Sequence, residues 1–257
     1  MWFDTHVNLH HERFDKDRAD VVARARDSGV SDMVEICQNA DDSDRVLGIA
    51  REHDLWATVG THPHYAKDAG NLTVERLVEV AKDDRVVGIG ETGLDFHYGY
   101  SGKASQRSNF AKHIEAAQQT QLPLVIHSRE ADAAMAETLT QAQSLMAFPM
   151  LLHCFTATPA LAETVLGLGG YVSFSGIVTF KKADDVREAV GLVPDDRIIV
   201  ETDCPYLTPV PDRGQRCEPR HVVNVGETVA RLRDVSAAAC AEMTTRNAYA
   251  LFAKAKR

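Results

Sequence analysis

Residues 86–129 read VVGIGETGLDFHYGYSGKASQRSNFAKHIEAAQQTQLPLVIHSR, and this stretch contains the unit from which the fold is predicted. It opens on the apolar run Val86–Ile89, of the kind that is buried on both faces of a parallel sheet. Ala104–Gln121 is rich in alanine, glutamine and lysine and stops before Pro123, as a helix does. A second apolar run, Leu124–Ile126, follows at once. The stretch therefore predicts a strand, a helix and a further strand.

The same alternation extends over the whole chain in both directions. Two more helices are expected at Asp15–Ser28, which ends at Gly29, and at Pro159–Leu168, which begins with a proline. Eight strand-plus-helix units in 257 residues take about 32 residues each, the usual size in α/β barrels. No linker rich in proline, glycine or serine divides the chain, so we expect one domain over residues 1–257, of class α/β with a single (β/α)8 TIM barrel. The expected strands are Met1–Phe3, Asp32–Ile36, Leu55–Val59, Val86–Ile89, Leu124–Ile126, Met150–Leu152, Tyr171–Phe174 and Ile198–Val200.

The composition limits the class of protein and the kinds of partner. Hydrophobic residues make up 44% and charged residues 25% of the chain, as in ordinary globular proteins. The net charge of −9 excludes a uniformly basic coat for nucleic acid, so an anionic substrate must meet a metal ion or a local cluster of cations. The five cysteines form no C-x-x-C pair and are expected as free thiols. We expect a cytoplasmic protein without membrane contact, since neither a signal peptide nor a membrane span is apparent in the sequence.

Polar side chains follow nearly every predicted strand. Because the carboxyl ends of all barrel strands surround one mouth, such residues converge there from distant parts of the sequence. Side chains at i and i+2 of a strand share a face, so we expect Asp4 with His6, His62 with His64, and Glu201 with Asp203 to point into the mouth together. The full set of candidates is Asp4, His6, His62, His64, Glu91, His127, Arg129, His153, Glu201 and Asp203.

This mixture of imidazoles and carboxylates indicates a hydrolytic metal site. Such a site needs neutral nitrogen ligands, anionic oxygen ligands and a position left for water. One histidine after a strand is more often a hydrogen-bonded wall residue. Five histidines together with Glu91, Glu201 and Asp203 at the same strand ends, however, point jointly to a metal. A carboxylate such as Glu91 can bridge two ions. Surface or capping roles are expected for the other histidines, which lack this register: His10, His11, His53, His97, His113 and His221.

Several cations follow the late strands on the same expected face. Arg129 and Arg213 are candidates for phosphate contact through charge-assisted hydrogen bonds. The Gly90–Gly93 turn lacks the register of a nucleotide-binding glycine loop, and we expect its glycines to shape the turn that presents Glu91. Further cations that could contact phosphate, or could lie in solvated loops, are Lys181, Lys182, Arg216 and Arg220.

At these residues the sequence resembles the TatD family of metal-dependent hydrolases and deoxyribonucleases. The resemblance implies an amidohydrolase-type barrel, a phosphodiesterase-like active site and four metal ligands, Glu91, His127, His153 and Asp203. It also implies that His62 and His64 are further mouth histidines and that Glu201 is a companion carboxylate. The motifs stand in the family's order and run nearly end to end: Gly60-Thr-His-Pro-His64, Gly90-Glu-Thr-Gly-Leu-Asp95, Pro123-Leu-Val-Ile-His-Ser-Arg-Glu-Ala131, His153-Cys-Phe-Thr156, Glu201-Thr-Asp-Cys-Pro-Tyr-Leu207 and Glu218-Pro219.

The opening motif departs from the family pattern. The usual Asp-x-His-x-His, whose two histidines bind metal, reads Asp4-Thr5-His6-Val7-Asn8 here. His6 therefore keeps a ligand place, whereas Asn8 offers only a neutral amide oxygen. Whether one or two ions bind stays open, with Mg²⁺ or Mn²⁺ favoured and Zn²⁺ allowed. Val7-Asn8-Leu9 resembles the TatD exonuclease branch of the family, which is associated with magnesium-dependent action on DNA and RNA ends.

These features favour hydrolysis of a phosphodiester, as a 3′-5′ exodeoxyribonuclease acting on single-stranded DNA ends, with RNA ends also open. A mouth with few cations suits a short single strand, because duplex binding draws on many phosphate contacts. The metal would activate water, and Asp203 or Glu201 would take its proton. The residues expected to act are Glu91, Glu201 and Asp203 in catalysis, Glu91, His127, His153, Asp203 and His6 on metal, and His62, His64, Arg129 and Arg213 on substrate.

Two other functions stay open at this point. One is the hydrolysis of a small amide, lactone or phosphoester, as relatives with this barrel perform. Many of those relatives bridge two metals through a carboxylated lysine after the fourth strand, where this chain has Glu91, so the phosphodiester is favoured. The other is a non-catalytic scaffold, against which the retained mouth histidines argue. No obligate protein partner is indicated.

Overall fold

The computed structural model describes residues 1–255, and its strands stand side by side in a parallel barrel. All eight predicted apolar runs form strands, which follow one another around the barrel in chain order. Every neighbouring pair from the first strand to the eighth is parallel. The strands are β1 (Trp2–Val7), β2 (Val30–Glu35), β3 (Trp56–Val59), β4 (Val86–Asp95), β5 (Leu124–Arg129), β6 (Met150–Leu152), β7 (Tyr171–Phe174) and β8 (Ile198–Val200).

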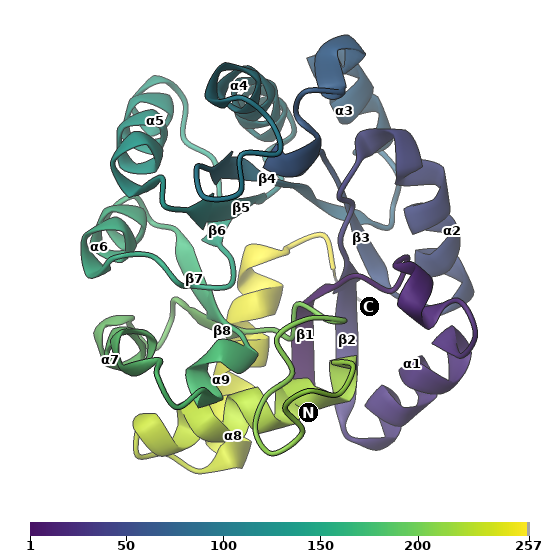
Figure 1. Cartoon of the computed structure of the whole chain (residues 1–257), viewed down its shortest axis with the longest axis vertical. Coiled ribbons are helices and arrows are strands. Elements are labelled where there is room, and N and C mark those ends of the chain that lie inside the picture. Colours follow the sequence, from purple (N-terminus) through teal and green to yellow (C-terminus); the bar gives the residue numbers. More distant parts are fainter. Residues whose placement is uncertain (256–257) are drawn as a thin grey trace.

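Helices follow the strands and, apart from the last one, form the outer layer of the barrel (Figure 1). This confirms the predicted α/β class and the TIM barrel. The α-helices are α1 (Arg18–Asp27), α2 (Ser43–Glu52), α3 (Val74–Val80), α4 (Lys103–Thr120), α5 (Asp132–Leu145), α6 (Pro159–Gly167), α7 (Asp184–Leu192), α8 (Val222–Leu232) and α9 (Ala237–Leu251). Short 3-10 helices are η1 (Glu12–Phe14), η2 (Ala40–Asp42), η3 (Pro63–Tyr65), η4 (Ala69–Asn71), η5 (Gly176–Thr179) and η6 (Pro219–His221).

The barrel closes between the first and the last strand through hydrogen bonds just beyond the end of β8. The backbone N–H of Asp203 donates to the carbonyl of His6 at 3.0 Å. Beside it, the buried Asp4 carboxylate accepts from both the backbone N–H and the hydroxyl of Thr202, at 2.9 and 2.6 Å. This seam brings the polar residues at the two ends of the sheet together.

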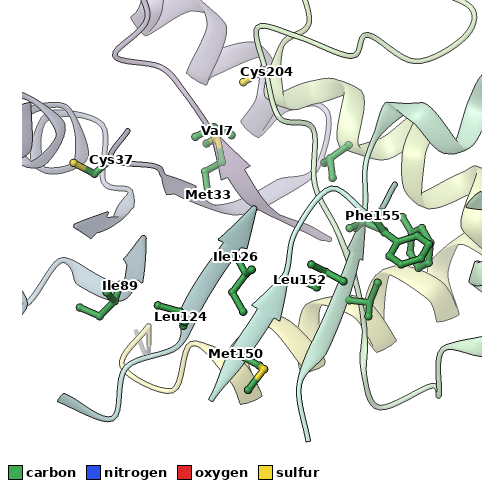
Figure 2. Close-up of a cluster of buried hydrophobic side chains, with 14 of the residues drawn as sticks. Val7, Met33, Cys37, Ile89, Leu124, Ile126, Met150, Leu152, Phe155 and Cys204 are labelled. Carbon is green, nitrogen blue, oxygen red and sulfur yellow. The ribbon is translucent and has the colours of Figure 1, made fainter. Parts of the chain in front are cut away.

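Two apolar clusters lie on the two faces of the sheet. The larger one packs α1 to α8 onto the outer face of the strands, and Figure 2 shows part of it, with Ile126 and Leu152 on neighbouring strands. The smaller one lies inside the barrel and contains Val125 and Leu151. Residues from α9 onward, Phe252 among them, complete this inner cluster, so the C-terminal segment plugs the barrel.

The position of the polar layer follows from the period of the strands. Side chains two residues apart share a face, so the positions after the inner apolar layer also face the barrel axis. Val125 is thus followed by His127, and Leu151 by His153. The inner apolar layer therefore lies directly beneath the imidazoles of His127 and His153.

Three strands extend beyond their predicted ends and carry polar residues within the sheet. β1 continues to Val7, β4 to Asp95 and β5 to Arg129. The predicted turn at Gly90–Gly93 is wrong, because β4 runs through it. Gly93 has φ +137°, and a Cβ there would lie 2.0 Å from the carbonyl oxygen of His127, so only glycine lets β4 approach β5 this closely.

In the part of the chain that the structure describes, no helix combines the length and the apolar character that crossing a membrane requires. All five cysteines are free thiols, as expected.

Candidate active site

Glu91 on β4 lies at the centre of four imidazoles that come from four different strand ends. Its Oε1 is 2.8 Å from His153 Nε2 and 3.3 Å from both His62 Nε2 and His127 Nδ1. Its Oε2 is 3.4 Å from His6 Nε2. The carboxylate is almost wholly buried, so these rings replace the water that would otherwise solvate it. The convergence predicted for these residues is confirmed.

Two of these imidazoles leave ring nitrogens without hydrogen bonds. Among the described residues neither ring nitrogen of His6 makes a hydrogen bond, and His153 Nε2 lies 2.8 Å from Glu91 Oε1 without hydrogen-bond geometry. The two rings stack with centroids 4.2 Å apart. Buried polar atoms are normally paired, because an unpaired one costs free energy. Unpaired imidazole nitrogens beside a buried carboxylate fit a divalent metal ion, which accepts their lone pairs.

The possible ligand atoms fall into two groups. His6, His153 and Glu201 offer one set of atoms within 4.8 Å of one another, and His62, Glu91 and His127 offer another. Asp203 stands close to the first group, with its Oδ1 3.5 Å from His6 Nε2. Glu91 touches both groups, which suits a carboxylate that bridges two ions.

Burial and the neighbouring imidazoles shift the pKa values of the carboxyl groups in opposite directions. Burial would raise the pKa of Glu91, but His153, His62 and His6 hold it well below its ordinary range. Burial raises the pKa of Asp203 to about 6, although His6 and His153 oppose the shift. Burial likewise raises the pKa of Asp4 to about 7, against its hydrogen bonds with Thr202. Of these three carboxylates, Glu91 is therefore the one that keeps its charge to the lowest pH.

Two further carboxylates lie behind the imidazoles and fix their orientation. Glu201 Oε1 is 3.1 Å from His153 Nδ1, and Glu201 Oε2 accepts a hydrogen bond from the Ser173 hydroxyl at 2.5 Å. Asp95 Oδ2 is 3.1 Å from His127 Nε2 and 2.9 Å from His64 Nε2. A carboxylate on the far nitrogen of an imidazole ligand sets its tautomer and ring plane.

Sequence reasoning assigned no role to Asp95. The signal was present, since Asp95 stands four residues after Glu91 and strand periodicity puts positions i and i+4 on one face. It was missed because the strand was expected to end at Ile89.

The expectation that Glu201 and Asp203 point into the mouth together is wrong. β8 ends at Val200, and Asp203 has φ +56°, so the strand alternation does not continue. Asp203 lines the main cavity with 18% of its side chain exposed, whereas Glu201 is fully buried beneath His153. Asp4 does not reach the mouth either, because its carboxylate is bonded to Thr202 at the seam.

Asn8 uses both ends of its amide group in hydrogen bonds. Its amide nitrogen donates to Asp203 Oδ1 at 3.2 Å and to the carbonyl of Cys204 at 3.0 Å. Its amide oxygen accepts from Gln38 Nε2 at 3.1 Å. Asn8 therefore positions Asp203.

The imidazoles and carboxylates line a cavity of about 480 Å³, here called the main cavity. Seven predicted site residues line it: His62, His64, Glu91, His127, Arg129, His153 and Asp203. His6 and Glu201 lie beneath its surface. Its rim is aromatic, because four exposed tyrosines also line it: Tyr65, Tyr98, Tyr100 and Tyr206.

Arg213 lies outside the main cavity. It lines a second cavity of about 430 Å³, here called the side cavity, together with Arg13 and Phe180. The two cavities share Tyr206 and Leu207.

The other cations named from the sequence line neither cavity. Arg216 is held by Asp17 and Glu218, and Arg220 lies 3.2 Å from Glu218. Lys181 and Lys182 are both exposed, in the segment after β7.

For the histidines that were not expected at the mouth, the expected surface or capping role is confirmed in some cases and wrong in another. His11 caps η1 by accepting from the N–H of Arg13, and His221 accepts from the N–H of Glu218, so capping is confirmed for both. A surface or capping role was expected for His113, but it is fully buried, and its Nε2 accepts from the N–H of Thr61. This bond holds α4 against the loop after β3.

Comparison with known proteins gives a consistent result. The family model described as TatD related DNase matches residues 3–253. A protein of Bacillus subtilis strain 168, named an uncharacterized metal-dependent hydrolase, YabD, is 36% identical over 253 residues, covering 98% of this chain and 99% of its own. The 3′-5′ ssDNA/RNA exonuclease TatD of Erwinia tasmaniensis is 36% identical over 258 residues, covering 97% and 99%. The crystal structure of the TatD homolog YJJV from Escherichia coli K12 superposes with a TM-score of 0.91, at 25% identity, over 98% of each chain.

Proposed function

This chain belongs to the family of TatD-related DNases and is a metal-dependent hydrolase acting on ester bonds, and we propose that it removes nucleotides from the 3′ ends of single-stranded DNA or RNA. The observation that carries the proposal is the buried Glu91 carboxylate, which lies close to imidazole nitrogens that make no hydrogen bond. It stands at the floor of a cavity whose rim carries tyrosines and an arginine.

The ligand atoms on either side of Glu91 support two divalent ions. We assign His6, His153 and Asp203 to one side and His62 and His127 to the other, with Glu91 shared. His62 thus moves from the substrate contacts to the ligands, because it is buried against Glu91. A divalent ion held here supplies an activated water and polarises a phosphoryl oxygen.

The remaining polar groups accept the proton of the water, position the histidines or bind the phosphate of the substrate. Asp203 reaches the main cavity and accepts a proton from the attacking water, whereas Glu201 is buried behind His153 and acts as a positioning residue. Asp95 positions His127 and His64 in the same way. Arg129 lines the cavity with no carboxylate partner among the described residues, so its guanidinium is free to bind phosphate.

The shape and lining of the main cavity favour a single strand. Single-stranded nucleic acids are commonly bound by aromatic rings on which bases stack, combined with a few cations. Tyr98 and Tyr100 are more than half exposed, and their rings are parallel within 6°. Bases of a duplex are stacked within the helix and cannot reach such rings, so we propose single-stranded ends as the substrate.

The test is a nuclease assay on a 3′-labelled single-stranded oligonucleotide with Mg²⁺, Mn²⁺ or Zn²⁺. We expect loss of the label with at least one metal, no cleavage in EDTA, and at least about a hundredfold loss of kcat/KM in Glu91→Gln, since partners of the ligands alone commonly account for 10- to 100-fold. The control is Glu242→Gln, an exposed carboxylate in a cavity lined by Met1 and by residues of β2 and α9. An intact label with every metal, or equal activity in EDTA and in Glu91→Gln, would contradict the proposal. Cleavage of lactones or amides in place of the oligonucleotide would also overturn it.

A further inference from the structure

The side cavity adjoins the main cavity on one flank. Its walls come from η1 after β1, from Phe180 after β7, and from the loop after β8. Tyr206 and Leu207 separate it from the main cavity and line both. In TIM barrels the loops after the seventh and eighth strands frequently bind phosphate. A chain seated in the main cavity can therefore continue into the side cavity over Tyr206.

Two arginines of the side cavity have no carboxylate partner. Arg13 donates to the carbonyl of Pro205 at 3.2 Å, and the Arg213 guanidinium lies over the Phe180 ring, 3.6 Å from its centroid. Within residues 1–255 neither arginine makes an ion pair. The neighbouring Asp212 faces His221 instead, at 3.5 Å.

The contrast with nearby arginines makes this arrangement informative. Arg24 and Arg216 are both neutralised by Asp17 and Glu218. In a chain of net charge −9, the cations that keep their charge uncompensated beside the main cavity are therefore few. Guanidinium groups with free N–H donors bind phosphate in a bidentate manner.

Tyr206 offers an apolar surface between the two cavities. The residue is 45% exposed, and the ring of His11 meets the Tyr206 ring edge-on at a centroid distance of 5.7 Å. A base can stack on such a ring while its phosphates lie on either side of it.

We propose that the side cavity binds the nucleotides on the 5′ side of the bond that is cut, with Arg13 and Arg213 on their phosphates and Tyr206 under a base. This inference rests on the proposed function and narrows it, because the substrate must then be a chain with several phosphates. A small phosphoester fills only the main cavity.

The experiment compares the kcat/KM for a single-stranded dinucleotide with that for a tetranucleotide. We expect the wild-type protein to prefer the tetranucleotide, and Arg13→Ala and Arg213→Ala each to reduce this preference on the order of tenfold, mainly through KM, since hydrogen bonds to charged groups are strong. The plot of log kcat/KM for the tetranucleotide against log salt concentration should flatten by about 0.7 per arginine removed. Arg13→Lys and Arg213→Lys keep the charge and should keep the salt slope.

A matched control and an alternative path make the result decisive. Arg246→Ala removes an exposed arginine from the cavity at the opposite end of the barrel and should keep the wild-type length preference. Tyr98 and Tyr100 stand after β4, across the barrel from β8, and mark the other direction in which a strand could leave. If Tyr98→Ala lowers the length preference and the arginine variants do not, the inference is overturned. If the wild-type protein cuts neither oligonucleotide, the proposed function is wrong. If it cuts both lengths equally well, only the nucleotide-binding role of the side cavity is contradicted.

Discussion

Replacing Glu201 with glutamine tests whether this carboxylate positions His153 or accepts the proton of the attacking water. Glu201 is fully buried, 3.1 Å from His153 Nδ1, with the Ser173 hydroxyl on its other oxygen. Burial opposes its ionisation, but His153 lowers the pKa of Glu201 below its ordinary value, so the group is a carboxylate at neutral pH. Glutamine keeps the shape and one acceptor oxygen and removes the charge.

The expected size of the effect follows from this geometry. Loss of an outer partner of a metal-ligating histidine commonly weakens metal binding or activity by 10- to 100-fold, or about 1.4–2.7 kcal/mol. Glu201→Gln retains a hydrogen bond to His153, so its loss of metal binding or activity should lie near 10-fold, the lower end of this range. Glu201→Ala loses the hydrogen bonds to His153 and to Ser173, so its loss should lie near 100-fold, the upper end of the range.

The assay is calorimetric titration of the metal-free protein with Mn²⁺, combined with kcat at saturating metal. We expect weaker metal binding and a kcat that recovers largely when metal is added in excess. Glu242→Gln, at the other end of the barrel, is the control and should match the wild type. Unchanged metal affinity with a loss of kcat of about 10²–10⁴ would refute the positioning role, because that pattern is typical of a lost general base.

Three further perturbations have defined outcomes. Asp203→Asn should lower kcat by about 10²–10⁴ with little change in the chemical denaturation midpoint, since it removes the proton acceptor that faces the cavity. Gly226→Ala should lower the free energy of unfolding by about 1–3 kcal/mol in urea titrations, because an added Cβ would lie 2.1 Å from the Trp2 ring; an unchanged midpoint would contradict this packing. Glu218→Gln should destabilise the protein at neutral pH, since Arg24 and its neighbours lower the folded-state pKa of Glu218 against the effect of burial. That stability is present above the ordinary carboxyl value of 4.5 and is lost as the pH falls through the lowered pKa, so the gap between the wild type and Glu218→Gln in thermal unfolding should close in acid and stay open at pH 7.

The strands were predicted well because their apolar runs are local features of the sequence. Met150–Leu152, Tyr171–Phe174 and Ile198–Val200 have the bounds expected for them. β4 was underestimated, since its polar second half continues to pair with β5. A run of apolar residues indicates a buried strand, but it does not indicate that the backbone pairing of β4 with β5 continues through the polar residues Glu91 and Asp95.

The convergence of the site was also predictable, because all strand ends of a barrel share one mouth. Glu91, His127 and His153 were identified from their places after three apolar runs and lie together in the structure. Asp95 was missed because the strand was expected to end too early. That Asp203 reaches the main cavity and Glu201 does not could not be foreseen from strand alternation, which stops at Val200.

The sequence alone determined the barrel, its order of strands and the residues that stand at its mouth, because these depend on period and spacing along one chain. Tertiary structure alone decided which of those residues reach the cavity. The left-handed backbone of Asp203 turns its carboxylate toward Asn8, a residue 195 positions away, and leaves Glu201 beneath His153. It also placed Arg213 beside Arg13 in a cavity of their own. Such contacts join loops from opposite ends of the chain, and no local pattern encodes the distance between them.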